Sequence, residues 1–144
     1  MKKIFMFVFF LLILCGCNTT KDPDTVINAL VEAKLPMTNI IALTAENDSN
    51  QLLGRPHQYV AKVDWMDTRI ANSGIPGKDT GGTLEVFLNA EDMKNRKDYL
   101  EAVTKGFSPF AEYSYGNRVL LLRLSHKLTP TQAKEYEDVF MGLP

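Results

Sequence analysis

Carboxylates on strand-like segments are the most direct chemical feature of this sequence. Two such groups at a suitable separation catalyse glycoside hydrolysis, as acid and base or as acid and nucleophile. Acids on strands also pair with cations across the sheet, and Lys62 or Arg123 would serve as partners. The pattern leaves a small carboxylate-dependent hydrolase open but favours cross-strand ion pairs. The four acids concerned are Asp64, Asp67, Glu85 and Glu112.

The remaining residues give little support for other kinds of catalysis. His57 and His126 stand outside any His-x-x-x-His or His-Glu pattern, and no serine lies in a Gly-x-Ser-x-Gly elbow. The glycine-rich stretch 73–82 lacks the hydroxyl residue of a phosphate-binding loop, because Asp79 follows its lysine. The sequence therefore predicts no catalytic residue, no metal ion and no cofactor.

Composition and length narrow the class of protein further. The 144 residues are 45% hydrophobic and 23% charged, which are the proportions of a globular protein. With 16 Lys+Arg against 17 Asp+Glu, the chain has no surplus of cations for a nucleic-acid backbone. A small domain that binds no nucleic acid is expected.

The N-terminus predicts export from the cytoplasm. Two lysines precede an apolar run from Ile4 to Cys15, as in a secretory signal peptide. The run is shorter than the ~20 residues that a membrane-spanning helix needs. The residues Leu14-Cys15-Gly16-Cys17 resemble the lipobox of bacterial lipoprotein precursors. This resemblance implies cleavage before Cys17 and attachment of diacylglycerol to its sulfur.

The domain organisation follows from this N-terminus. Residues 1–16 are interpreted as a lipoprotein signal peptide, 17–21 as the lipidated N-terminus with a short linker, and 22–144 as one domain. Both cysteines lie at the signal boundary, so the mature domain would contain no free thiol. Lipid chains such as palmitate would hold the protein on the extracytoplasmic side of the cell membrane.

Hydrophobic periodicity and helix-capping residues predict three helices and five strands in the folded part. Their order, α-β-β-β-α-β-β-α, indicates an α+β fold in which an antiparallel sheet of about five strands carries helices mainly on one face. The helices are expected at 22–35, 89–106 and 129–142, and the strands at 39–44, 57–65, 83–88, 110–115 and 118–124.

Three segments of the domain resemble a family of small uncharacterised lipoproteins of Gram-positive bacteria. They are residues 52–59, residues 81–87 and the helix that begins at Thr129-Pro130. The resemblance extends from Asp22 to about Phe140. It implies an α+β domain at the cell surface, and it assigns no activity, ligand or catalytic residue.

A partner-binding surface is predicted on the polar face of the sheet. Period-2 spacing places Phe87 and Leu121 on the same face as the charged strand residues. If the helices cover only the opposite face, these two side chains meet solvent or a partner. The alternative is that a long loop covers them.

Arg55, between Gly54 and Pro56, is a second candidate for partner binding. Its guanidinium would anchor a carboxylate or phosphate of the partner, or else pair internally with Asp48 or Glu46.

Two functions remain open at this stage. The first is a non-catalytic binding or accessory domain that acts on another envelope protein, including an immunity or exclusion role. The alternative is the small carboxylate-dependent hydrolase. A deep polar cleft that joins two acids with raised pKa values would favour the enzyme, and an apolar surface rimmed by charge would favour binding.

Overall fold

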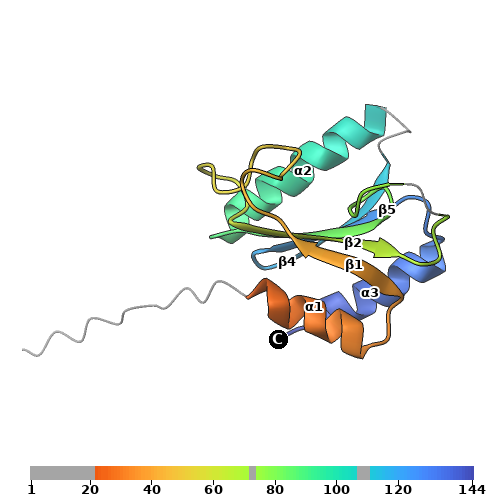
Figure 1. The fold of residues 1–144 in the computed structure, drawn as a ribbon. Coiled ribbons are helices and arrows are strands. Elements are labelled where there is room, and N and C mark those ends of the chain that lie inside the picture. The colour runs from red at the N-terminus through yellow and green to blue at the C-terminus, as the bar shows by residue number, and fades with distance from the viewer. Residues whose placement is uncertain (1–21, 72–73, 107–110) are drawn as a thin grey trace, which may run out of the picture.

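The computed structural model describes residues 22–71, 74–106 and 111–144 (Figure 1). The predicted signal peptide and Cys17 lie outside these residues, as do Ser73 and Phe110. None of the helices in the described ranges is long and apolar enough to cross a membrane. The elements are α1 (Pro23–Glu32), β1 (Met37–Ala42), β2 (Ala61–Asp67), β3 (Gly81–Val86), α2 (Ala90–Gly106), β4 (Glu112–Asn117), β5 (Leu120–Ser125) and α3 (Pro130–Met141).

The strands form one antiparallel sheet in the order β1-β2-β3-β5-β4. The predicted α+β class with a five-stranded antiparallel sheet is therefore confirmed. The hairpin of β4 and β5 folds back after α2, so β5 pairs with β3 and β4 becomes an edge strand. The other edge is β1.

Helices α1 and α3 pack on one face of the sheet (Figure 1). Asp22 caps α1, while Thr129 and Gln132 form the predicted capping box of α3. Phe140 of α3 is fully buried, as predicted. The ring of Tyr136 stacks on Trp65 with their centroids 6.1 Å apart. This face holds the larger apolar core.

The opposite face is also covered, so the prediction of an open face is wrong. Helix α2 lies across it together with residues 43–60, the connection from β1 to β2 (Figure 1). Phe87 and Leu121 are fully buried there in a second apolar cluster with Met93 and Leu100 of α2. The polar stretch 43–60 has no apolar periodicity that would have placed it over the sheet.

Several element boundaries also differ from the sequence prediction. Strand β2 begins at Ala61 because His57, with φ of 61°, lies in a turn. The β4–β5 turn contains Arg118, with φ of 57°, and lies after the predicted Tyr115-Gly116-Asn117. Gly81 and Gly82, expected in a loop, begin β3.

Gly82→Ala is expected to destabilise the domain by about 1–3 kcal/mol through overpacking. A Cβ at position 82 would lie 2.3 Å from Cζ2 of the buried Trp65 ring. Urea denaturation measures the effect. Gly116→Ala is the control, because its Cβ would meet the flexible end of Met93 at 3.1 Å and Cδ of the flexible Lys97 at 3.5 Å. Equal losses in the two variants would contradict the assigned packing of Trp65.

Candidate functional site

Ionisable side chains cluster beneath α2 and residues 43–60, and we call this cluster the ionic network. The members of the network on β2, β3, β4 and β5 lie at alternating strand positions, so their side chains point to the same face of the sheet. Asp48 joins them from the connection above, and Arg96 joins from α2. Its members are Asp48, Lys62, Asp64, Glu85, Arg96, Glu112 and Arg123.

Arg123 connects two of the buried carboxylates. Its Nε and Nη2 donate to the two carboxylate oxygens of Glu112, each at 2.8 Å, and its Nη1 donates to Glu85 Oε1 at 2.7 Å. Arg96 Nε donates to the other oxygen of Glu85 at 3.3 Å. Burial acts to lower the pKa of Arg123, but Glu112 and Glu85 outweigh it and raise that pKa. Glu85 and Glu112 are therefore held as internal counter-ions.

Asp48 fastens the β1–β2 connection to the sheet. Its carboxylate accepts hydrogen bonds from Tyr59 Oη at 2.7 Å, from the backbone N–H groups of Leu52 and Leu53, and from Lys62 Nζ at 3.0 Å. Burial acts to raise the pKa of Asp48, but these donors together hold it well below its ordinary value. Asp48 is thus a structural anchor that also fixes the ammonium of Lys62.

Asp64 has a different environment from the other acids of the network. Its Oδ1 accepts from Thr83 Oγ1 at 2.8 Å, and its Oδ2 lies 3.9 Å from Lys62 Nζ, too far for a hydrogen bond. Among the residues that the structure describes, none donates a hydrogen bond to Oδ2. Burial raises the pKa of Asp64, because the nearby donors do not fully compensate for lost hydration.

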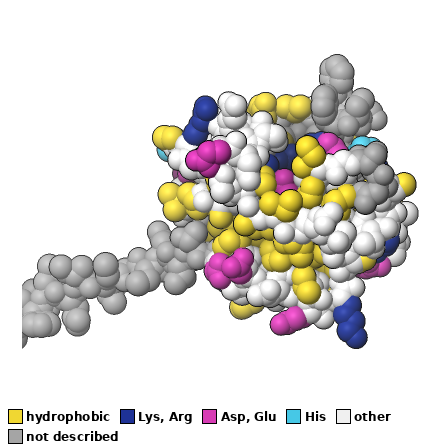
Figure 2. Space-filling model, in the orientation of Figure 1, with side chains coloured by type: hydrophobic (Ala, Val, Ile, Leu, Met, Phe, Trp, Pro, Cys, Tyr) yellow, Lys and Arg dark blue, Asp and Glu magenta, His cyan; other side chains and the backbone are white. Residues whose placement is uncertain are grey.

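Asp64 lies in a cavity of about 300 Å³, which we call the sheet pocket. Thr83, Lys62 and Arg123 also line it from the sheet. Figure 2 shows charged side chains recessed among hydrophobic ones on this side of the molecule. The apolar lining comes from Ile41, Leu43, Ile75 and Pro76.

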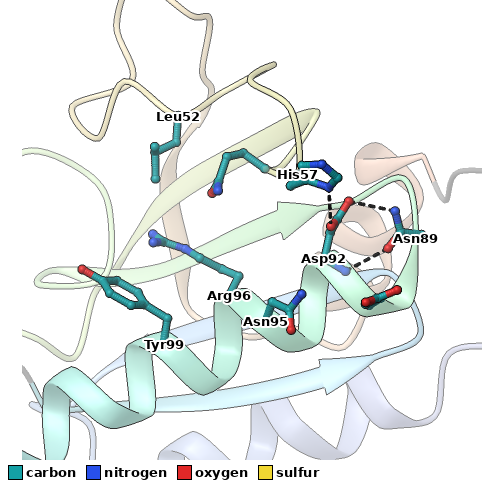
Figure 3. A pocket seen from close by; sticks show the side chains of 9 residues that line it. Leu52, His57, Asn89, Asp92, Asn95, Arg96 and Tyr99 are labelled. Carbon is teal, nitrogen blue, oxygen red and sulfur yellow. Dashed lines mark hydrogen bonds and ion pairs between the residues drawn. The ribbon is translucent and has the colours of Figure 1, made fainter.

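A larger cavity of about 650 Å³ lies between residues 52–58 and α2 (Figure 3). At one end, His57 Nδ1 lies 3.1 Å from Asp92 Oδ1. Asn89 caps α2, as predicted: its Oδ1 accepts from the Asp92 N–H, and its amide donates to Asp92 Oδ2, each at 2.8 Å. The His57–Asp92 pair therefore joins the connection to the start of α2.

The larger cavity offers less specific chemistry than the sheet pocket. Its cation, Arg96, is already paired with Glu85 and lies 6.0 Å from the Tyr99 ring. The pair formed by His57 and Asp92 has no nucleophilic serine, threonine or cysteine beside it among the lining residues. The sheet pocket is therefore the better candidate site.

The residues predicted to bind a partner are not brought together. Arg55 is exposed, and within the described part of the chain its side chain makes no ion pair, because Lys62 takes the place expected for it on Asp48. Phe87 and Leu121 are inaccessible beneath α2, so their assignment to a binding surface is corrected.

Of the four acids considered for hydrolysis, Asp64, Glu85 and Glu112 lie in the ionic network and Asp67 does not. Asp67 lies on the α3 side of the sheet, where Arg69 and Tyr136 bind its carboxylate. Glu85 and Glu112 both hold Arg123, which leaves Asp64 without a second free carboxylate among them. Lys62 was expected to pair with an acid across the sheet, and Asp48 was expected to pair with Arg55, but the contact of Lys62 with Asp48 and the role of Thr83 were not predicted.

Comparison of the chain with protein-family models, with curated proteins and with solved structures found no match. The structure alone therefore gives the class of this protein, which is an α+β domain with a charged pocket on the α2 side of its sheet.

Asp64→Asn is expected to stabilise the domain at neutral pH by roughly 0.5–2 kcal/mol, the range common for stabilising substitutions. A raised pKa in the fold means that ionised Asp64 opposes folding, and this cost grows as pH rises from about 3.9 through the raised value. Asparagine carries no such charge and retains an acceptor for Thr83.

Urea denaturation at pH 7 and near pH 3 tests this sign. The difference between Asp64→Asn and wild type should shrink at the lower pH, where Asp64 is protonated in both states. Asp98→Asn, on the exposed side of α2, should change stability by no more than about 0.5 kcal/mol. A less stable Asp64→Asn at pH 7 would contradict the raised pKa.

Proposed function

We propose that this chain is a lipid-anchored domain of the bacterial cell envelope that binds another envelope protein in its sheet pocket without catalysing a reaction. The observation that carries the proposal is Oδ2 of Asp64, which lies at the pocket without a hydrogen-bond donor on a side chain that is only 12% exposed. A buried charge left incompletely paired opposes folding, so its presence favours a role in binding.

The internal pairing of the other acids supports binding over hydrolysis. General acid–base catalysis needs a group that takes or releases a proton beside the substrate. Glu85 and Glu112 are fixed by Arg123, and Asp48 is fixed by Lys62. Asp64 is then the one network carboxylate available to a ligand, which suits recognition better than a two-carboxylate reaction.

The lipobox-like residues 14–17 support the anchored location. Residues 18–21 would form a linker of at most ~14 Å when fully extended, so the domain would lie close to the membrane. A partner in the same membrane, or one that approaches it, would be within reach of the pocket.

Asp64→Asn tests the binding proposal in the native membrane. Wild-type protein, chemically cross-linked in intact cells of its own bacterium and purified, should bring down a specific partner, and Asp64→Asn should lose most of it. Asp98→Asn is the matched control and should retain the partner. If Asp64→Asn, shown to be folded by its denaturation midpoint, retains the partner fully, the pocket is not the binding site.

Cys17→Ala tests the anchor separately. Without the acceptor sulfur, the protein should incorporate no labelled fatty acid, and it should either appear in the medium or remain an uncleaved precursor. Membrane fractionation and the mass of the mature chain measure this outcome. Normal processing with full membrane retention would refute lipidation at Cys17.

A further inference from the structure

The ionic network lacks one positive charge. Four carboxylates face three cations, and each of these side chains is at most 12% exposed. At the rim, Lys78 and Asp79 pair with each other and add no net charge. An ionised network therefore has a net negative charge in a region with little water to screen it.

The missing charge has a definite position at Asp64 Oδ2. Lys62 is held by Asp48, and Arg123 donates to Glu85 and Glu112, so neither cation moves to Asp64 without leaving another acid unpaired. Gly77 leaves room beside this oxygen, because a Cβ at that position would lie only 3.3 Å from it. A donor that enters the pocket has access to Oδ2.

The number of free acceptors limits the kind of cation. Thr83 already occupies Oδ1, so Asp64 presents a single oxygen. A guanidinium binds best to both oxygens of a carboxylate, whereas an ammonium is satisfied by one. Calcium needs six or more oxygen ligands, and the described residues contain no group of three or more His, Cys, Asp or Glu side chains that could hold a metal ion. An ammonium fits best.

The walls and the size of the pocket limit what carries this ammonium. Ile41 and Ile75 are 41% and 86% exposed, and with Leu43 and Pro76 they supply an apolar lining beside the charged residues. An aliphatic stem packs against such a surface while its charged end reaches a polar group. A volume of about 300 Å³ is at the lower end of the roughly 300–1,000 Å³ of small-molecule sites. It suits one extended side chain.

We infer that the sheet pocket binds a primary ammonium on an aliphatic stem, the group at the end of a lysine side chain, with Asp64 Oδ2 as its acceptor. This inference rests on the proposed function and names the group that the partner presents. Binding supplies the missing positive charge, and Lys62 and Arg123 keep their present partners.

The lipidated mature protein in detergent micelles, titrated with small amines, tests the inference. The probes are n-butylammonium chloride and Nα-acetyl-lysine methylamide, with n-butanol and Nα-acetyl-norleucine methylamide as uncharged counterparts. Amide NMR shifts of Asp64, Gly77 and Thr83 report binding. Each amine should bind saturably and more than about tenfold tighter than its uncharged counterpart. This difference in affinity is the one expected for a single hydrogen bond to a charged group.

Two variants locate the binding. Asp64→Asn should weaken both amines by more than about tenfold. Asp79→Asn, at the exposed rim of the same pocket, should leave the affinities for both amines within about threefold of the wild-type values. An exposed charge contributes little to binding. Tighter binding of the lysine derivative than of n-butylammonium would indicate a protein side chain as the source. Equal binding would indicate a free amine.

Failure of this inference is distinguishable from failure of the proposed function. If neither amine binds, if the uncharged counterparts bind equally well, or if Asp64→Asn binds the amines as wild type does, the ammonium assignment is overturned. Loss of the cross-linked partner in Asp64→Asn would still support the proposed function in each of these cases.

Discussion

Arg123→Met is expected to reduce the free energy of unfolding by about 3–5 kcal/mol, the cost of removing one partner from a buried ion pair. Methionine fills much of the same volume, but Glu112 loses its cation and Glu85 keeps only Arg96, at 3.3 Å. Glu85 is fully buried, so its charge cannot turn to water without moving α2 or the sheet. Such a loss is a large fraction of the 5–15 kcal/mol typical of small domains. Urea denaturation at pH 7 measures it.

Neutralising the two acids separates charge from packing in this prediction. The triple variant Arg123→Met, Glu85→Gln, Glu112→Gln carries no unpaired carboxylate at these positions and should recover part of the lost stability, but only part, because Arg96 loses its carboxylate partner. A triple variant as unstable as Arg123→Met would show that the arginine stabilises the sheet mainly through its packing. Wild-type stability in the single variant would contradict a buried network.

The sides of the sheet were predictable from the sequence because strand alternation is strict. Leu84 and Leu122 lie against α1 and α3, while Glu85 and Arg123 lie on the other face, as their spacing indicates. The cross-strand pairing of Arg123 with an acid was also foreseen. Periodicity of 2 assigns side chains to a face, but it does not show whether that face meets solvent.

The covering of the second face was not predictable in the same way. The face of α2 that packs on the sheet contains Arg96 as well as Met93 and Leu100, so its sequence pattern does not indicate a strongly apolar helix face. The connection that joins it depends on Asp48, whose partners come from its own turn and from β2. A polar residue in a polar stretch gives no sign in the sequence that it becomes a buried anchor.

The character of the candidate site follows from this covering. Lys62 and Asp64 on an exposed strand would be ordinary solvated charges with little effect on stability. Under α2 and the connection they lose water, and Asp64 becomes the acid whose pairing is incomplete. The sequence supplied the residue types, and the long-range contacts supplied the burial that distinguishes one acid from the rest.

Phe87→Ala is expected to destabilise the domain by about 3–5 kcal/mol, the usual cost of removing a buried phenylalanine ring. The ring is fully buried and meets Tyr59 edge to face, with centroids 6.1 Å apart and planes at 88°. Since Tyr59 also donates to Asp48, the cavity left by Phe87 would loosen the connection over the sheet pocket. Thermal and urea denaturation measure the loss.

Arg55→Ala is the matched control for Phe87→Ala, because both residues were candidates for partner binding but only Phe87 is buried. Removing an exposed side chain without an ion pair in the described structure should change stability by no more than about 0.5 kcal/mol. If Phe87→Ala is as stable as Arg55→Ala, then α2 does not cover this face in solution, and the open binding surface inferred from strand alternation would be restored.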